Sequence, residues 1–397
     1  MKKQLVVALG LTVLATPAFA SKARLQALGE DTDGSFYIND NRNIFLNAAH
    51  VNNHKDFVTF ETGSFTGDAD TANDTDLADS SAAPRAEGGV FFGQGNLVYG
   101  VQLGNESATA DTLRAWAGVE SEQNNLDLFV GGDAGVKWGA NLTYGHVSET
   151  STVNNSDVMR VRLGAVAGDV EGFANVSLKN SAADKTGHEV EGKLGYQIGG
   201  SYAMNAYKVF AEYRSIKAED KKENADAEIG LMRVGVGRTD KLNDKATLFT
   251  KVEYSRNKGN IENGSGSCVG APCAPGEVVA TYNGTPLSTG GDDLIVTNLP
   301  IIIGLEYDAA SWLVVRGSVS QSIFSDKSIK GASNANLDNT TVVNLGSTLK
   351  FGEMSIDGVI GNSSNVGGDT TIASSGTNGS LRTDNLMSRV SVSYKWE

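Results

Sequence analysis

Residues 386–396 read LMSRVSVSYKW, and apolar and polar side chains alternate along them. One parity holds the apolar residues Leu386, Val390, Val392, Tyr394 and Trp396. The other parity holds the polar residues Arg389, Ser391, Ser393 and Lys395. A two-residue period of this kind predicts a β-strand with one apolar face and one polar face.

This last stretch resembles the closing strand of Gram-negative outer-membrane β-barrels, whose assembly machinery recognises a C-terminal aromatic residue. Trp396 would supply that aromatic, although Glu397 follows it here. The resemblance implies an antiparallel barrel that spans the outer membrane. It also implies contact with the assembly machinery, the lipid bilayer and lipopolysaccharide.

The same alternation recurs along the chain, for example in YKVFAEYR at residues 207–214. Residues 190–198, 248–254 and 343–351 repeat it, each with ionisable groups on the polar face. Unpaired charges in apolar surroundings are costly, so that face needs water or ionic partners. A barrel around a polar lumen provides both on every strand.

The pattern predicts an all-β fold, a transmembrane antiparallel β-barrel of about sixteen strands with a range of 14–18. Short and long links alternate between the strands, as turns at the inner end and loops at the outer end of such barrels do. Residues 112–121 fit an inward-folded loop better than a strand. The predicted strands cover 57–65, 88–95, 97–106, 126–133, 135–148, 157–168, 171–179, 187–199, 206–218, 227–239, 245–258, 297–308, 312–324, 339–351, 353–362 and 384–396.

Composition agrees with many closely packed strands, since the chain holds 47 glycines and only 6 prolines. After residue 20 no apolar run reaches the roughly 18 residues of a membrane-spanning helix. The formal net charge of −14 argues against nucleic-acid partners.

The first residues predict export. Lys2 and Lys3 precede the apolar run of residues 5–14, and Ala18-Phe19-Ala20 forms a small-x-small cleavage pattern. We therefore expect a cleaved signal peptide at 1–20, an N-terminal cap or hatch segment at 21–56, and a barrel at 57–397. The expected location is the outer membrane of a Gram-negative cell.

Residues 21–56 do not alternate. Asp40, Asn47, Ala49 and Val51 resemble the start of FadL-type fatty-acid transporters, in which such a segment forms a hatch, although Ala48 replaces the family's proline. The runs 24–29 and 43–47 also resemble the major outer-membrane porin-like proteins of Bdellovibrio-type bacteria. A periplasmic cap sealing the barrel floor is the plain alternative to a hatch.

The polar parity of the strands supplies the candidate pore-lining side chains, which are mainly basic. General porins resemble this arrangement, in which a basic wall faces an inward-folded acidic loop. A plugged barrel, in which these charges only pair and stiffen the wall, is the alternative. The candidates are Arg160, Arg162, Lys193, Lys208, Glu212, Arg214, Arg233, Lys251, Glu253, Arg316, Lys350 and Arg389.

Two cysteines, Cys268 and Cys273, predict a small disulfide loop in a Gly/Ser/Pro-rich hairpin tip. The four histidines match no metal-binding spacing, so no metal or cofactor is expected. A serine–histidine hydrolase around His146 or His188 would need a nucleophile motif, and the sequence has none. We expect no enzyme.

These patterns predict a porin that lets small hydrophilic solutes and ions diffuse through a water-filled lumen. Two alternatives stay open: a hatch-gated, FadL-like transporter of hydrophobic compounds, and a structural or adhesive surface barrel. Porins typically form homotrimers, but the outward faces of the strands do not reveal this assembly.

Overall fold

The computed structural model describes residues 21–62, 86–362 and 389–396, apart from gaps inside the second range. The gaps are 108–109, 112, 115–116, 118, 120, 123, 150–152, 223, 263–266, 269–270, 273–277, 283–284, 289–293, 330–334 and 337–340. The predicted signal peptide, Cys273 and the first residues of the predicted last strand lie outside the described residues. The disulfide therefore stays a prediction.

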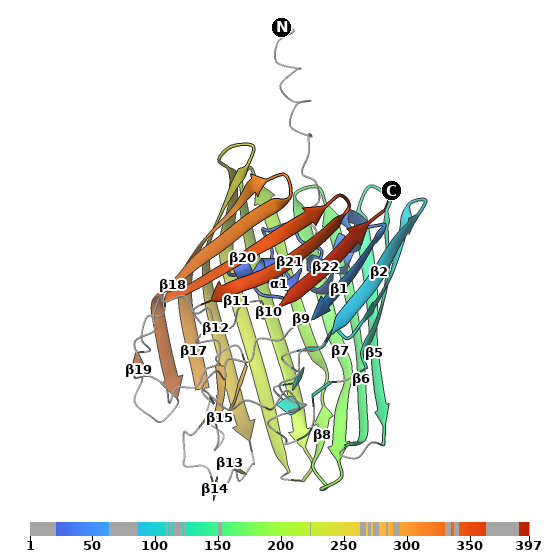
Figure 1. The fold of residues 1–397 in the computed structure, drawn as a ribbon. Coiled ribbons are helices and arrows are strands. Elements are labelled where there is room, and N and C mark those ends of the chain that lie inside the picture. The colour runs from blue at the N-terminus through green and yellow to red at the C-terminus, as the bar shows by residue number, and fades with distance from the viewer. Residues whose placement is uncertain are drawn as a thin grey trace, which may run out of the picture.

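The chain forms a closed antiparallel barrel of 16 strands (Figure 1), which confirms the predicted fold. Each strand pairs with its sequence neighbours, and β1 closes the ring by pairing with β22. The count takes β8 and β9 as one interrupted strand and leaves out the two-residue β19. The barrel strands are β1 (Phe57–Thr62), β2 (Glu87–Gln94), β3 (Leu97–Leu103), β4 (Leu126–Asp133), β5 (Lys137–Ser148), β6 (Val153–Ala167), β7 (Val170–Asp184), β8 (Glu189–Gly192), β9 (Gly195–Met204), β10 (Tyr207–Asp220), β11 (Ala225–Lys241), β12 (Ala246–Glu262), β17 (Leu294–Ala310), β18 (Leu313–Ile329), β20 (Thr341–Phe351), β21 (Met354–Asn362) and β22 (Val390–Lys395).

Small elements complete the described chain. Before the barrel come α1 (Lys22–Ala27), α2 (Asn43–Leu46) and the 3-10 helix η1 (Ala48–Asn53). Two hairpins pair β13 (Ser267–Cys268) with β14 (Ala271–Pro272) and β15 (Val278–Tyr282) with β16 (Thr285–Ser288). The short β19 (Ala335–Asn336) pairs with β18. None of the described helices is long and apolar enough to cross a membrane.

The strands stand where the alternation predicts them, but several extend further at the end with the long links. β6 begins at Val153 and β7 ends at Asp184, so the predicted loops at 149–156 and 180–186 are shorter than expected. Similarly, β10 and β11 leave only residues 221–224 between them. At the end with the long links, polar residues lie on both faces of a hairpin. The apolar–polar alternation therefore stops before the backbone pairing between the two strands ends.

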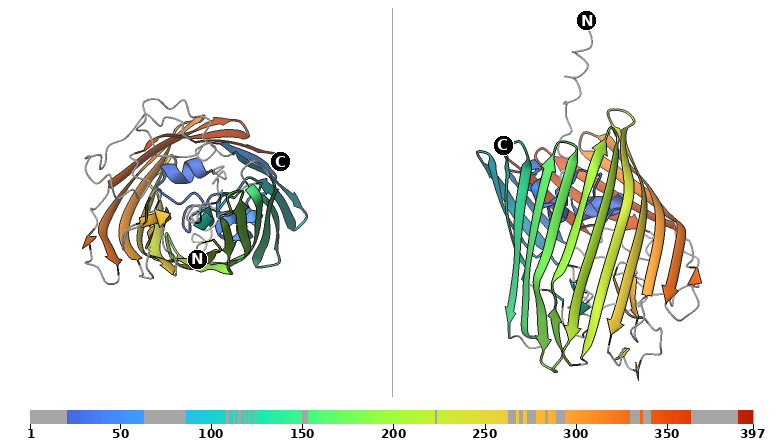
Figure 2. Two further views of the ribbon diagram at one scale, coloured as in Figure 1. Left: turned by 90° about the horizontal axis from the view of Figure 1, so that it is seen from below. Right: turned by 180° about the vertical axis from the view of Figure 1, so that it is seen from behind.

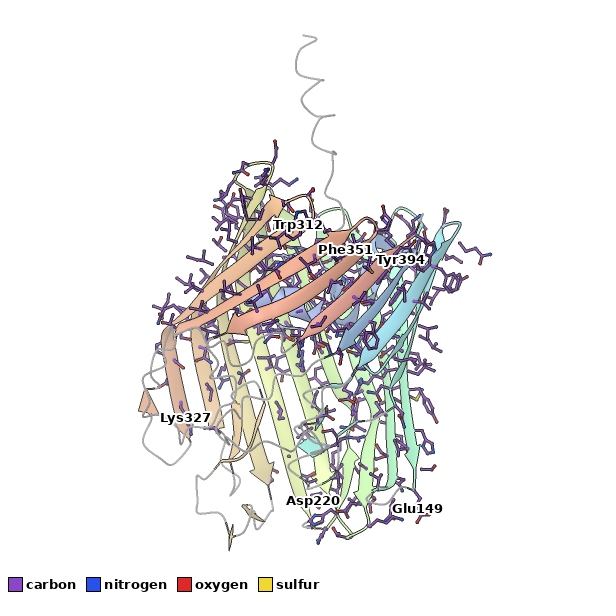
Figure 3. The ribbon with its side chains drawn as sticks, in the orientation of Figure 1. Glu149, Asp220, Trp312, Lys327, Phe351 and Tyr394 are labelled. Atoms are coloured by element: carbon purple, nitrogen blue, oxygen red, sulfur yellow. The ribbon has the colours of Figure 1, made fainter. Side chains whose placement is uncertain are left out.

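Along most strands, exposed apolar side chains alternate with buried side chains, many of which are polar or charged. On β22, Ser391 and Ser393 are buried whereas Tyr394 is 46% exposed. Tyr213 of β10 is likewise exposed beside Ile198 and Met232 of the neighbouring strands. Trp312, Phe351 and Tyr394 lie near the short-turn end (Figure 3) and are all exposed, as expected for an interfacial aromatic girdle.

Candidate functional site

The barrel interior is occupied near its short-turn end by residues 21–56, which we call the luminal segment (Figure 2). Ser21 caps α1 by accepting a hydrogen bond from the backbone N–H of Arg24 at 3.0 Å. Asn47 caps η1 in the same way through the N–H of Ala49. Since nearly all of this segment's apolar side chains are buried against the wall, it lies within the barrel and does not form a cap outside its floor.

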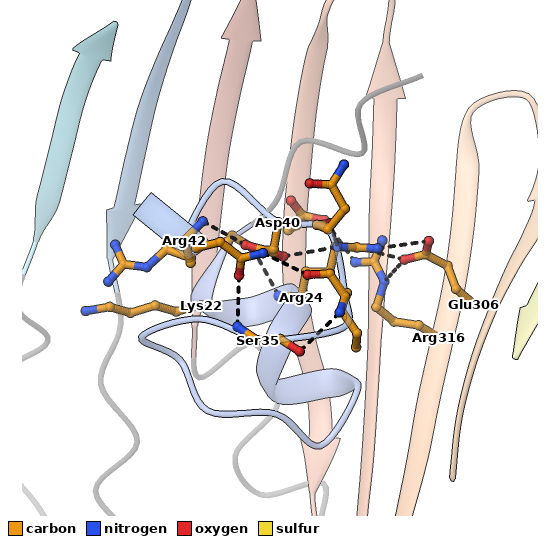
Figure 4. Close-up of polar contacts among 12 residues, drawn as sticks. Lys22, Arg24, Ser35, Asp40, Arg42, Glu306 and Arg316 are labelled. Atoms are coloured by element: carbon orange, nitrogen blue, oxygen red, sulfur yellow. Dashed lines mark hydrogen bonds and ion pairs between the residues drawn. The ribbon is translucent and has the colours of Figure 1, made fainter. Parts of the chain in front are cut away.

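Arg24 is the central ionic contact of the luminal segment (Figure 4). Its guanidinium donates to Asp40 of the same segment at 3.0 Å and to Glu306 of β17 at 2.9 Å. Glu306 also accepts from Arg316 of β18 at 3.0 Å, and Arg316 reaches Asp357 of β21 at 2.9 Å. Arg24, Asp40 and Arg316 are almost fully buried, so each of these charges depends on its partners.

Further ion pairs join the luminal segment to strands around the ring. Lys22 and Arg42 both reach Glu87 of β2, at 2.7 and 3.2 Å. Glu30 accepts from Lys251 of β12 at 2.8 Å, and His50 contacts Glu171 of β7 at 2.8 Å. Asp31 lies 3.7 Å from Arg233 of β11. The segment is therefore attached on several sides and spans the lumen.

Glycines of the wall strands make room for the luminal segment. A Cβ atom at Gly139 would lie 2.1 Å from the carbonyl oxygen of Ala48, and one at Gly164 would lie 1.8 Å from Oδ1 of Asn47. A Cβ at Gly237 would lie 2.3 Å from the ring of Tyr37. Contacts below 3.0 Å do not occur for real Cβ atoms, so these positions accept only glycine while the segment stays in place.

A second element enters the lumen from the end with the long links. We call residues 104–125 the inner loop, and its described residues confirm the predicted inward fold. Leu113 and Val119 pack against Val190, Ala218 and Ile229 of the wall. The buried Arg114 donates to Asn180 at 2.7 Å and to Ser156 at 2.8 Å. Glu122 forms an ion pair with Arg160 of β6.

A partly open chamber of about 80 Å³ lies between the luminal segment and the inner loop. Asp31, Asp33 and Phe45 line it from the luminal segment, and Asn105, Glu106 and Ser107 line it from the inner loop. The wall contributes Asn175, Gln197 and the arginines Arg160, Arg162, Arg214 and Arg233. The candidate site is this chamber together with the ionic contacts that close the lumen beside it.

Most of the residues predicted to line the pore are paired with acidic groups. Arg160 contacts Glu122, Arg162 contacts Asp127, Lys208 contacts Glu171, and Lys350 contacts Asp308. Glu212 lies between Arg214 and Arg233, at 3.3 and 2.6 Å. Lys251 lies 3.3 Å from Glu253, and Arg389 is half-buried, with Glu61 and Glu87 among the charges around it. That these residues line an open pore stays a prediction.

Lys193 differs from the rest of that set. It lies in the interruption between β8 and β9, half-exposed, with Glu219 and Asp226 as partners. Glu219 and Asp226 have the opposite parity from the buried Ala218 and Ala227. Lys193 therefore lies at the outer rim of the barrel and not in the lumen.

Strand parity does not identify the residues that close the lumen. Arg24, Arg42, Arg114 and Glu122 all lie in stretches without a two-residue period, so strand parity gave no direction for their side chains. The available signal was a charged residue within a short apolar run, as in Arg24-Leu25 or Leu113-Arg114. Such residues are buried only when distant partners meet them.

Folding shifts the pKa values of two buried groups in the luminal segment in opposite directions. Burial, together with nearby His50, lowers the pKa of His54 to about 3, so folding favours the neutral ring. Burial raises the pKa of Asp40 to about 6, although Arg24 counteracts this. Lowering the pH below 6.5 therefore destabilises the segment through His54, and lowering it below 6 stabilises the segment through Asp40.

We expect the His54→Gln variant to reveal how protonation of Asp40 changes the stability of the docked luminal segment with pH. In the wild type the two contributions oppose each other between pH 6 and 4, so the stability of the docked segment changes little. In the variant it should rise as the pH falls, by roughly 1 kcal/mol per pH unit. Protease release of residues 21–56, measured from pH 7 to 4, tests this. Identical pH profiles for the two proteins would contradict it.

Comparisons with known proteins find similarity only to solved structures, at low sequence identity. No family model matches the sequence, and no curated protein matches it. OmpT of Vibrio cholerae is similar at 13% identity and a TM-score of 0.39, with 86% of this chain and 97% of that one covered. The toluene transporter TbuX of Ralstonia pickettii is similar at 12% identity and a TM-score of 0.36, with 96% of this chain and 99% of that one covered. A porin refined at 1.8 Å resolution is similar at 12% identity and a TM-score of 0.37, with 86% of this chain and 99% of that one covered. These values carry no function to this chain.

Proposed function

We propose that this protein is an outer-membrane channel for the diffusion of small hydrophilic solutes and ions, which the luminal segment closes at rest. Three features support it. The exposed apolar outer face suits a bilayer, and the inner face carries charged groups on most strands. Sixteen strands enclose a lumen wide enough for an aqueous passage once the segment moves.

The observation that carries this proposal is the ionic character of the contacts between the luminal segment and the wall. Glu87, Lys251 and Glu306 each bind a charged group of the segment, and Glu171 contacts the imidazole of His50. If the segment leaves, these wall charges become hydrated instead of remaining unpaired in an apolar cavity. The vacated path is then a water-lined passage, which suits polar solutes.

A second candidate is passage of hydrophobic compounds, favoured by aromatic side chains that the luminal segment covers. Phe36 stacks on Phe210 at a centroid distance of 4.6 Å and lies 6.0 Å from Phe173. On another side, Phe45 packs against Phe129, which contacts Phe91. Moving the segment would expose these rings, and an apolar solute would find contacts along them.

Planar-bilayer recordings of the full-length mature chain and of a chain lacking residues 21–56 separate these functions. We expect small or rare conductance steps for the former and large, stable steps for the latter, with sugars entering liposomes. Entry of hydrocarbons but not of sugars would support the second candidate. If the shortened, folded barrel admits neither, a structural or adhesive role replaces both. Reversal potentials in a salt gradient then give the ion preference.

A further inference from the structure

The luminal segment and the inner loop, which enter the lumen from different ends, are joined by a hydrogen bond. Nη2 of Arg42 donates to Oδ1 of Asn105 at 3.0 Å, across 63 positions of the chain. Arg42 is 5% exposed and Asn105 is 2% exposed, so the protein shields this bond from water. The two elements that fill the lumen are therefore in direct polar contact.

Arg42 contacts three separate parts of the protein through one guanidinium group. Its Nε donates to the carbonyl oxygen of Thr32 in the luminal segment at 3.1 Å, and its Nη1 lies 3.2 Å from Glu87 of β2. Its Nη2 donates to Asn105, while the carboxylate of Asp33 lies 4.0 Å from the same atom, beyond hydrogen-bond distance. Without Asn105 this buried charged donor loses its acceptor, which favours movement of the segment toward water.

The base of the inner loop holds Asn105 in position. Gly104 has a φ of 80°, and a Cβ atom there would lie 2.4 Å from the carbonyl oxygen of Ala86, so only glycine fits this turn. The N–H of Gly104 donates to the carbonyl oxygen of Asn125 at 2.9 Å. Nδ2 of Asn125 in turn donates to the carbonyl oxygen of Asn105 at 2.9 Å. The two ends of the loop are thus bonded to each other around Asn105.

Glu122 connects this base to the barrel wall. Its Oε2 accepts from Nδ2 of Asn125 at 2.9 Å, and its Oε1 pairs with Arg160 of β6. All five residues in the series Arg42, Asn105, Asn125, Glu122 and Arg160 are buried. A continuous series of buried polar contacts can carry coupling between two elements, and its strength is measured by perturbing one element and observing the other.

We propose that Arg42 couples the luminal segment to the inner loop, so that moving the base of the inner loop releases the segment and opens the lumen. This inference rests on the proposed function, because it names what regulates the closed channel. The coupling is reciprocal, since two linked equilibria shift each other by the same factor. A solute or partner that displaces the inner loop at the end with the long links would open the channel without touching the segment.

Hydrogen exchange of the full-length mature chain in detergent, followed by mass spectrometry of its peptides, tests this coupling. Asn105→Ala removes the acceptor of Arg42 and leaves the luminal segment itself unchanged. We expect exchange and protease cleavage of residues 21–56 to become roughly 5- to 150-fold faster, as the loss of a buried charged hydrogen bond predicts. Asn105→Asp keeps an acceptor and should stay at or below the wild-type rate. An unchanged rate in Asn105→Ala would overturn the proposal.

Glu122→Gln tests transmission through the loop, because Glu122 reaches Arg42 through the two asparagines of the loop base. It should also speed exchange of residues 21–56, and heat-modifiable migration on gels shows whether the barrel still folds. The matched control is Asn180→Ala. Asn180 of β7 is buried and accepts from Arg114 of the inner loop at 2.7 Å, outside the series that ends at Arg42. Acceleration in Asn180→Ala equal to that in Asn105→Ala would indicate general loosening and refute the coupling.

Arg42→Gln tests the reverse direction. It should speed exchange of the inner-loop amides of Gly104 and Ser107, and unchanged rates at both would contradict reciprocity. None of these measurements needs conduction, so the two proposals fail separately. Coupling in a barrel that conducts nothing would refute the channel and leave the coupling. Large conductance steps on removal of residues 21–56, without coupling, would refute the role of Arg42 and leave the channel.

Discussion

Replacing Gly139 or Gly164 by alanine is expected to open the lumen while the barrel stays folded. The new methyl group would meet Ala48 or Asn47 of the luminal segment well inside van der Waals contact. Overpacking of this kind typically costs about 1–3 kcal/mol. That free energy corresponds to roughly a 5- to 150-fold shift toward the displaced segment. Single-channel recordings should show the shift as a higher open probability with unchanged step size.

The matched control is Gly172→Ala in β7. A Cβ atom there has Gly199 O as its nearest neighbour at 3.8 Å, which is ordinary contact. This variant should behave like the wild type. The explanation fails if Gly139→Ala and Gly164→Ala also leave open probability unchanged, or if Gly172→Ala raises it equally.

Replacing Arg24 by alanine is expected to give the largest loss of stability in the luminal segment. The substitution leaves the buried Asp40 and the wall residue Glu306 without their shared partner. Removing one partner of a buried ion pair costs about 3–5 kcal/mol, because the remaining charge stays buried. The segment should then be cleaved by an added protease much faster than in the wild type, while heat-modifiable migration of the barrel persists.

Arg238→Ala provides the comparison for that loss. Arg238 pairs with Asp240 at 2.6 Å, but its side chain is 40% exposed. Pairs of that kind contribute only about 0–1 kcal/mol, so protease release should stay near the wild-type rate. Equal release in Arg24→Ala and Arg238→Ala would show that the Arg24 contacts do not hold the segment.

The chamber and its ionic contacts could be anticipated from the sequence only in part. Arg160, Arg214, Arg233 and Glu212 were selected from strand parity, and the structure places them on the inner face. Their partners Glu122 and Asp31 lie in segments without a period, so parity could not assign them. Lys193 was misplaced because the strand breaks between β8 and β9, and parity does not continue across a break.

The sequence by itself determined the barrel, because the two-residue alternation is a local property that assigns the inner and outer face of each strand. Tyr394 outside and Ser393 inside follow from it directly. Only the tertiary structure decided what fills the lumen. The hydrogen bond between Arg24 and Glu306 joins residues that are 282 positions apart in the chain. Asn47 lies beside Gly164 only because the luminal segment folds into the barrel. Such contacts depend on how distant segments meet in space, which no local period encodes.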